Sequence, residues 1–407
     1  MTFLKRIYNL LRANGVSRFI VKSFNYLMAE YYRLYMKISA PFSPGLIRKY
    51  KDKTINPDEV KHVLFIRLWG MGDMVLSIPA LLMLKERFRD AEFTLVGSEG
   101  AARVTEGSGF FDHEFTVPLS GIESSSPDIY KAFDHARKLS PDLVFVAYPL
   151  LSWRVADIVN RLGAKWVFAS SEDIQSENIT KSVKISQDQN AVQAIASVAA
   201  AAGCKGPVPK IKLQISQEDR DIAHQWIIAN APQKVKISFH IGCTPKMTQK
   251  AWPLDRFADL AFRLHDNMDV SLILLEGPDE KEIVKQLTAS SNVPFKIAGE
   301  NLTLHQTMAL IEKIDLLVTN DSFWMHAASA LNTPLVALFG PAPQSFEPWG
   351  HSKYTRIIRS NRDCSPCWQP GTKLDCENPR CMESIDVDTV EKAVLDLLSI
   401  NNRGTEI

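Results

Sequence analysis

The 407-residue sequence lacks any apolar run that approaches the roughly 18 residues of a membrane-spanning helix, which excludes a helical integral membrane protein. Its beginning also lacks a continuous signal-peptide core, because Asn9, Arg12 and Asn14 interrupt the apolar residues. Cysteine is scarce, and six cysteines are too few for a secreted disulfide scaffold. Together these absences predict a cytoplasmic protein.

Net charge is nearly absent as well, at +1, so the chain has no overall field that would attract nucleic acid. The charge is unevenly spread, because residues 1–53 hold eleven basic side chains and only two acids. Within this segment, apolar and aromatic residues of 18–37 recur at helical spacing on one face, opposite the basic ones. Such a helix is typical of one lying on an anionic membrane surface, and a helix docked on the protein's own core is the alternative.

The remaining chain alternates short apolar strands with helices, which is the pattern of a parallel sheet covered on both faces. Strands are expected at 63–68, 93–97, 142–148, 235–242, 271–277, 315–321 and 335–340. Helices are expected at 73–88, 127–139, 153–162, 190–202, 254–266, 279–289, 303–313 and 323–331, with a last amphipathic helix near 387–398. A proline-glycine break at 205–210 separates two similar halves. We therefore predict an α/β protein with a basic helical extension at 1–50 and two Rossmann-like domains, 51–210 and 211–407, that face a cleft.

The stretch GMGDMV at 70–75 lies where the first strand turns into a helix. A dinucleotide-binding loop would need glycine or alanine where Val75 stands, and Asp73 places negative charge where a pyrophosphate would sit. Two interpretations of Asp73 stay open: it caps the helix, or it is a general base that the helix dipole keeps ionised. In the second, Gly70 and Gly72 form the turn and leave room for an acceptor.

A phosphate site is better predicted in the second half. The loop HIGCTPKMTQKAWP at 240–253 leaves a strand, enters a helix and presents Thr244, Thr248 and Lys250. Hydroxyls and an ammonium at a strand end are suitable donors for a diphosphate. A solvated polar loop is the alternative.

Polar residues also follow two other strands of this half. Asp321 and Ser322 stand at a helix start, where free backbone N–H groups bind anions, and His326 follows on the same helix. Glu276 ends a strand, where a carboxylate can bind the two hydroxyls of a ribose. The alternatives are a packed histidine and a solvated glutamate.

Four of the six cysteines cluster late in the chain with the spacing C-x2-C-x8-C-x4-C. They are Cys364, Cys367, Cys376 and Cys381. Four thiolates on one loop in a reducing compartment suit a tetrahedral zinc or iron ion with a structural role. Two disulfides or four free thiols are the alternatives.

These motifs resemble the ADP-heptose:lipopolysaccharide heptosyltransferase family, glycosyltransferase family nine. The resemblance covers about residues 62–398 and is carried by VLFIRLWGMGDMVLSIPALLMLKERF, HIGCTPKMTQKAWPLDRFADLAFRL, LLEGPDE and DLLVTNDSFWMHAASALNTPLVALFGP. It implies a GT-B fold whose N-terminal domain binds the acceptor and whose C-terminal domain binds the nucleotide-sugar. It also implies an inverting transfer without a catalytic cofactor.

The resemblance assigns roles to individual residues. Asp73 matches the catalytic base, Lys250 and a loop threonine match donor-phosphate contacts, and Glu276 matches the acid after the donor-domain strand. Asp321, Ser322 and His326 match the phosphate-binding helix. Family members often have Asn-Asp-Ser-Gly-Pro here, whereas this chain has Phe323 and Trp324 after the serine, which alters the pocket wall.

The expected function is transfer of a heptose from ADP-heptose to a lipopolysaccharide core. The enzyme would lie on the inner face of the cytoplasmic membrane of a Gram-negative bacterium, held to anionic lipid by residues 1–50. A heptosyltransferase acting on a protein adhesin and a non-catalytic sugar-nucleotide-binding scaffold are the alternatives.

Overall fold

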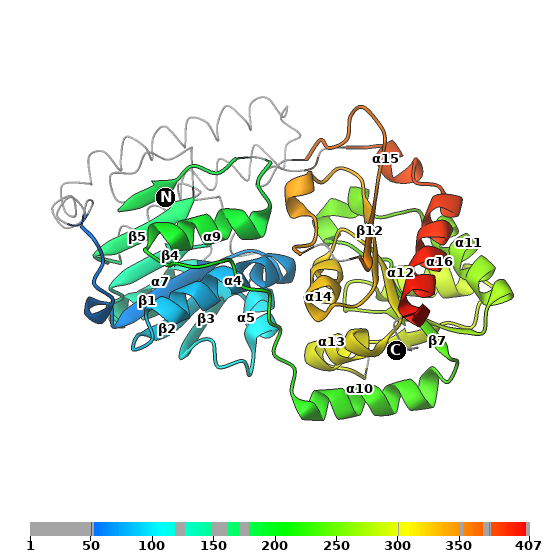
Figure 1. Cartoon of the computed structure of the whole chain (residues 1–407), viewed down its shortest axis with the longest axis horizontal. Helices are drawn as coiled ribbons and strands as arrows, with labels where there is room; N and C mark the ends of the chain where they lie inside the picture. Colours follow the sequence, from blue (N-terminus) through cyan, green and yellow to red (C-terminus); the bar gives the residue numbers. More distant parts are fainter. Residues whose placement is uncertain are drawn as a thin grey trace.

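The computed structural model describes residues 50, 53–118, 127–147, 159, 162–170, 179–186, 188–299, 301–350, 353–368, 374 and 376–403. These residues form two lobes that lie side by side, each built on a six-stranded sheet whose strand pairs are all parallel (Figure 1). The extension predicted at 1–50 and most of the helix predicted at 153–162 lie outside the described residues. No helix of the described chain is long and apolar enough to cross a membrane.

The sheet of the first lobe has the strand order β3-β2-β1-β4-β5-β6. Its strands are β1 (His62–Arg67), β2 (Glu92–Ser98), β3 (His113–Val117), β4 (Leu143–Val146), β5 (Trp166–Ser170) and β6 (Lys181–Val183). Its helices are α4 (Met71–Arg87), α5 (Glu99–Thr105), α7 (Pro127–Lys138) and α9 (Ala191–Ala201). Alternate residues of β1 face opposite sides: Val63 and Phe65 pack toward α4 and α9, whereas Leu64 and Ile66 pack toward α7.

The sheet of the second lobe has the order β12-β11-β10-β7-β8-β9. Its strands are β7 (Val235–His240), β8 (Val270–Leu275), β9 (Lys296–Ala298), β10 (Leu316–Asn320), β11 (Leu335–Phe339) and β12 (Thr355–Arg359). Its helices are α10 (Gln217–Asn230), α11 (Leu254–Asn267), α12 (Lys281–Ser290), α13 (Leu304–Lys313), α14 (Phe323–Leu331), α15 (Arg380–Glu383) and α16 (Val387–Arg403). Helices α11, α12 and α16 cover one face, and α13 and α14 cover the other.

The apolar strand runs of the sequence are confirmed as strands that are buried on both faces, as central parallel strands require. The structure adds elements that the sequence did not single out: the helices α5, α10 and α15 and the strands β3, β5, β6, β9 and β12. Strand β12 is only half-buried along its length, and α10 buries only Ala223 and Ile227, so neither has a strong apolar pattern. Helix α10 is held to α13 by packing and by the Arg220–Glu312 ion pair, at 2.7 Å.

The two lobes meet where α4 of the first contacts α14 of the second (Figure 1). Gly72 permits this approach, because a Cβ there would lie 3.2 Å from His326 Cδ2 and 3.5 Å from Phe323 Cα. A hydrogen bond from Asn190 Nδ2 to the Glu347 carbonyl, at 3.1 Å, also crosses between the lobes. The starts of α4 and α14 are therefore brought together at the interface.

Candidate active site between the two lobes

Asp73 lies in the first turn of α4, but it does not cap that helix. The N-cap residue is Gly70, which makes no side-chain capping bond, and Asp73 is the third helical residue. Its carboxylate instead pairs with Arg67, with Nη2 and Oδ1 2.8 Å apart. The capping interpretation of Asp73 is therefore wrong, because a guanidinium at the end of β1 holds the carboxylate.

The Arg67–Asp73 pair is asymmetric. The Arg67 side chain is 1% exposed and donates from Nη1 to the Ala147 carbonyl at 2.8 Å, whereas the Asp73 side chain is 31% exposed. A buried guanidinium needs a compensating charge, and a carboxylate that still reaches solvent can also meet a ligand. The pair therefore presents an oriented carboxylate at the interface between the lobes.

The second lobe supplies a buried ion pair at the start of α14. Lys250, the last residue of the 3-10 helix η3 (Pro245–Lys250), lies with its Nζ 2.7 Å from Asp321 Oδ2. Asn320 fixes the same loop, because its Nδ2 donates to the carbonyls of Ile241 and Gly242 and its Oδ1 accepts from Trp252 N. Two predicted site residues far apart in sequence are thus in direct contact.

Ser322 is the N-cap residue of α14, yet its hydroxyl does not cap the helix. The Ser322 Oγ lies 3.1 Å from His240 Nδ1 and 3.1 Å from Thr319 Oγ1. The first N–H groups of α14 therefore receive no capping bond from Ser322, and a helix start of this kind is suited to an anion.

His326 is buried at the contact between α4 and α14. Burial lowers the pKa of the His326 imidazole, although Asp321 and Asp73 act in the opposite direction. The ring is therefore neutral at neutral pH, and its Nδ1 has no hydrogen-bond partner among the described residues. His326 belongs to α14 of the second lobe, and its ring lies against Gly72 of α4 in the first lobe.

The sequence analysis missed His240 and Glu280, which lie beside the predicted phosphate loop. His240 Nε2 is 3.7 Å from Glu280 Oε1, and Gly277 N donates to Glu280 Oε2 at 2.9 Å. Burial pushes the pKa of the Glu280 carboxyl upward, but His240 and the Gly277 N–H outweigh it, so the pKa lies below its ordinary value. Polar residues at the ends of β7 and after β8 were the signal that could have identified this pair.

Glu276, the carboxylate predicted to bind a ribose, is not part of the His240–Glu280 pair. It lines a cavity of about 290 Å³ together with Trp226, Lys281, Ile297 and Asn301. Thr244 and Thr248 are both exposed on the loop that carries Lys250.

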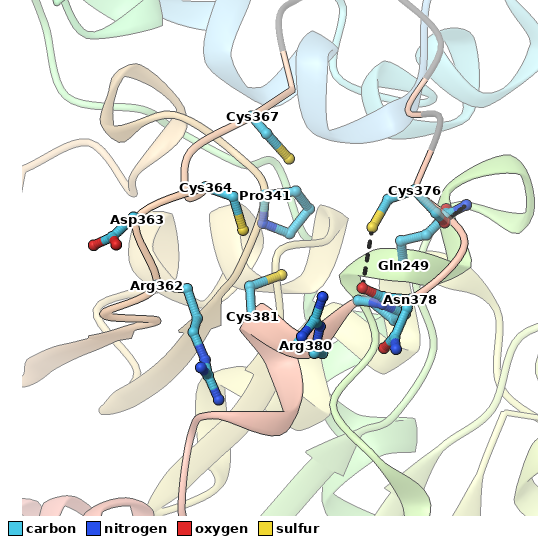
Figure 2. Close-up of a pocket in the computed structure, with 11 residues that line it drawn as sticks. Gln249, Pro341, Arg362, Asp363, Cys364, Cys367, Cys376, Asn378, Arg380 and Cys381 are labelled. Atoms are coloured by element: carbon cyan, nitrogen blue, oxygen red, sulfur yellow. Dashed lines mark hydrogen bonds between the residues drawn. The ribbon is translucent and has the colours of Figure 1, made fainter.

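The four clustered cysteines line one cavity of about 410 Å³ beyond the end of β11 (Figure 2). We call residues 364–381 the cysteine loop. Within its described residues, Cys364 and Cys367 are exposed, Cys381 is buried, and Cys376 Sγ contacts the Asn378 carbonyl at 3.3 Å. No three histidine, cysteine or acidic side chains in the described chain are grouped closely enough to hold a metal ion.

Comparison with solved structures identifies the fold. The fold matches a glycosyl transferase family 9 protein of Veillonella parvula, with a TM-score of 0.69 and 21% identity over 85% of this chain and 99% of that one. It also matches the E. coli ADP-heptose lps heptosyltransferase II, with a TM-score of 0.64 and 20% identity over 84% of this chain and 99% of that one. The two-domain α/β architecture is therefore the GT-B fold of glycosyltransferases.

Sequence comparison then gives the family. Residues 140–377 match glycosyltransferase family 9 (heptosyltransferase), and the chain belongs to this family. A curated relative, lipooligosaccharide heptosyltransferase 2 of Campylobacter jejuni, is 24% identical over 345 residues, which is 82% of this chain and 98% of that protein. The protein is a glycosyltransferase enzyme.

Proposed function

We propose that this enzyme transfers a heptose from ADP-heptose to the core of lipopolysaccharide, with inversion at the anomeric carbon. The observation that carries the proposal is that the start of α4, which bears Asp73, packs against the start of α14, beside which the Lys250–Asp321 pair lies. The names of the relatives support the substrates, because one is a lipooligosaccharide heptosyltransferase and another an ADP-heptose lipopolysaccharide heptosyltransferase.

Asp73 is the proposed base. An acceptor hydroxyl attacks the anomeric carbon of the donor, and the Asp73 carboxylate takes the hydroxyl proton as the new bond forms. Arg67 fixes the direction of that carboxylate, with Nη2 and Oδ1 2.8 Å apart. A single displacement of this kind inverts the anomeric centre and uses no catalytic metal.

The second lobe is the proposed site of the leaving diphosphate. The Lys250 ammonium and the uncapped N–H groups of α14 stabilise the negative charge that develops on the leaving ADP. Asp321 balances the buried Lys250 charge until the donor binds. Thr244 and Thr248 add hydroxyl donors, and Ser322 and His326 complete the wall of the site.

The nucleoside is proposed to lie beyond the ends of β8 and β9. Glu276 there lines the cavity of about 290 Å³ with Asn301 and Trp226, so a carboxylate, an amide and an aromatic ring are available to a ribose and a base.

The direct test offers ADP-heptose, UDP-sugars and GDP-sugars in turn, with heptose-deficient lipopolysaccharide as the acceptor. We expect transfer from ADP-heptose alone, with inverted configuration of the product by NMR, and a rise in melting temperature with ADP. Transfer only from a UDP- or GDP-sugar, or a product that retains configuration, would contradict the proposal. A protein acceptor modified in preference to lipopolysaccharide would contradict the acceptor.

A peripheral position on the cytoplasmic face of the inner membrane is proposed from the basic sequence of 1–50. Deletion of residues 1–50 should weaken sedimentation with anionic vesicles and leave transfer to a short soluble acceptor unchanged. Equal sedimentation of the full chain and the deletion variant would contradict the membrane role.

We also propose that the four thiolates of the cysteine loop hold a structural zinc or iron ion. Four thiolates are ligands that zinc and iron prefer, and all four cysteines line the same cavity. Metal binding would have to draw the sulfurs closer together than they are in this structure. Metal analysis of protein purified without chelator should find about one zinc or iron per chain. Its absence, or equal metal content in Cys364→Ser, would contradict the assignment.

A further inference from the structure

One aromatic ring connects the cysteine loop to the lysine of the proposed phosphate site. The Lys250 Nζ lies 4.3 Å from the centre of the Trp368 ring, and Trp368 directly follows Cys367. We propose that Trp368 is a positioning residue for Lys250, which holds the lysine ammonium where the donor diphosphate binds. This inference rests on the proposed function of Lys250.

The structure fixes Trp368 independently of Lys250. The backbone N–H groups of Cys367 and Trp368 both donate to the Pro341 carbonyl, at 3.1 and 3.0 Å, and the Ser365 hydroxyl donates to the Gly340 carbonyl at 2.6 Å. The Phe346 ring packs beside Trp368 with centroids 5.4 Å apart. These contacts anchor the segment that bears the indole to the residues directly after β11.

Contacts other than the Trp368 ring also hold Lys250 and its neighbour Gln249 in place. Gln249 Nε2 donates to the Cys376 carbonyl at 3.2 Å, so the cysteine loop contacts the residue before Lys250. The Asp321 carboxylate, at 2.7 Å, completes the environment of the ammonium, and the residue is only 7% exposed. Two parts of the cysteine loop thus bracket η3.

A ring face is well suited to this task. An ammonium has three N–H donors, and a cation–π contact attracts its charge without a hydrogen-bond acceptor that would compete with a phosphate oxygen. The lysine side chain is long and has large rotamer entropy, which the ring reduces before the donor arrives. Because the Lys250 side of the contact is buried, we expect this cation–π pair to be stronger than a pair on the protein surface.

The test measures ADP affinity by calorimetry and donor KM by transfer assay, for Trp368→Leu, Trp368→Phe and Lys250→Met in the full chain. We expect Trp368→Leu to weaken ADP binding about tenfold and to raise the donor KM more than it lowers kcat. Phenylalanine keeps an aromatic face, so Trp368→Phe should stay within about threefold of the unmodified protein. Tyr354→Leu removes another cation–π pair, with Lys353 at 5.0 Å, and is the matched control with unchanged ADP affinity.

A double-variant cycle separates positioning from a general structural role. If Trp368 acts through Lys250, Trp368→Leu adds no further loss of ADP affinity in the Lys250→Met background. Two outcomes would overturn the role of Trp368 but leave the donor site standing. One is an equal loss of ADP affinity from Trp368→Leu with and without Lys250→Met. The other is an unchanged ADP affinity of Trp368→Leu although Lys250→Met binds ADP weakly. Unchanged ADP affinity of Lys250→Met would instead overturn the proposed donor site.

Discussion

Asp73→Asn should cost stability as well as activity, because Asp73 neutralises a guanidinium that water cannot reach. Arg67 is 1% exposed, and the change removes the Asp73 carboxylate that lies 2.8 Å from its guanidinium. Loss of one partner from a buried ion pair typically costs about 3–5 kcal/mol of unfolding free energy. Because the Asp73 side chain is 31% exposed, water can solvate part of this pair, so we expect a loss at the lower end, about 3 kcal/mol. In a domain of this size that is a fall in melting temperature of about 6–12 °C.

A second variant tests the electrostatic origin of this loss. Arg67→Met combined with Asp73→Asn removes the charge and keeps an apolar side chain of similar length, so it should recover most of the stability. About 1 kcal/mol remains lost because the Ala147 carbonyl no longer accepts from Arg67 Nη1.

Heptose transfer separates the two roles of Asp73. Both variants should lose about 10²–10⁴-fold in kcat, because neither has a base. The melting temperature is measured by circular dichroism, and kcat is measured by a transfer assay on the same preparations. A melting temperature of Asp73→Asn within about 2 °C of the unmodified protein would refute the electrostatic reasoning, since that corresponds to less than about 1 kcal/mol. Normal turnover would refute the assignment of the base.

Three further predictions concern the same interface. Burial lowers the pKa of His326 in the folded protein below the ordinary value of 6.5. As the pH falls below about 6.5, the unfolded chain therefore binds a proton at His326 more readily than the folded protein does. The free energy of unfolding should then decrease below this pH and reach its full value above it. His326→Gln should flatten this fall in melting temperature between pH 7.5 and 5, and an unchanged profile would contradict it. Gly72→Ala should lower the melting temperature, because its Cβ meets His326 Cδ2 at 3.2 Å, whereas Gly70→Ala meets its nearest atom only at 4.0 Å and should not. Glu280→Gln should raise the donor KM, because it loosens His240 beside Ser322, and calorimetry with ADP that finds equal affinity would count against this.

The fold was largely predictable, because most central strands are short apolar runs. The residues of β1, β4 and β10 are buried on both faces, as central parallel strands require, and their apolar sequences indicate this directly. Helix α10 was not predictable in this way, because its place depends on α13 and on the ion pair between Arg220 and Glu312. The proposed domain boundary near 205–215 stays a prediction.

The candidate site was predictable only in part. Asp73, Lys250 and Asp321 stand at strand and helix ends, where polar residues in a parallel α/β protein meet ligands. Arg67 was passed over because it belongs to an apolar strand, although a charge at the end of such a strand is itself a signal. Trp368 carried no signal, since nothing local relates a loop tryptophan to a lysine in a distant loop.

The sequence by itself determined the central strands, most of the helices around them, the family and the polar residues at the ends of these elements, because these depend on local pattern and backbone preference. Only the tertiary structure decided which of those residues meet. The contacts of Asp73 with Arg67, of Lys250 with Asp321 and Trp368, and of Gly72 with His326 depend on how loops and lobes pack. Packing brings together groups that are far apart in the chain, and the contacts so formed fix the directions of their side chains.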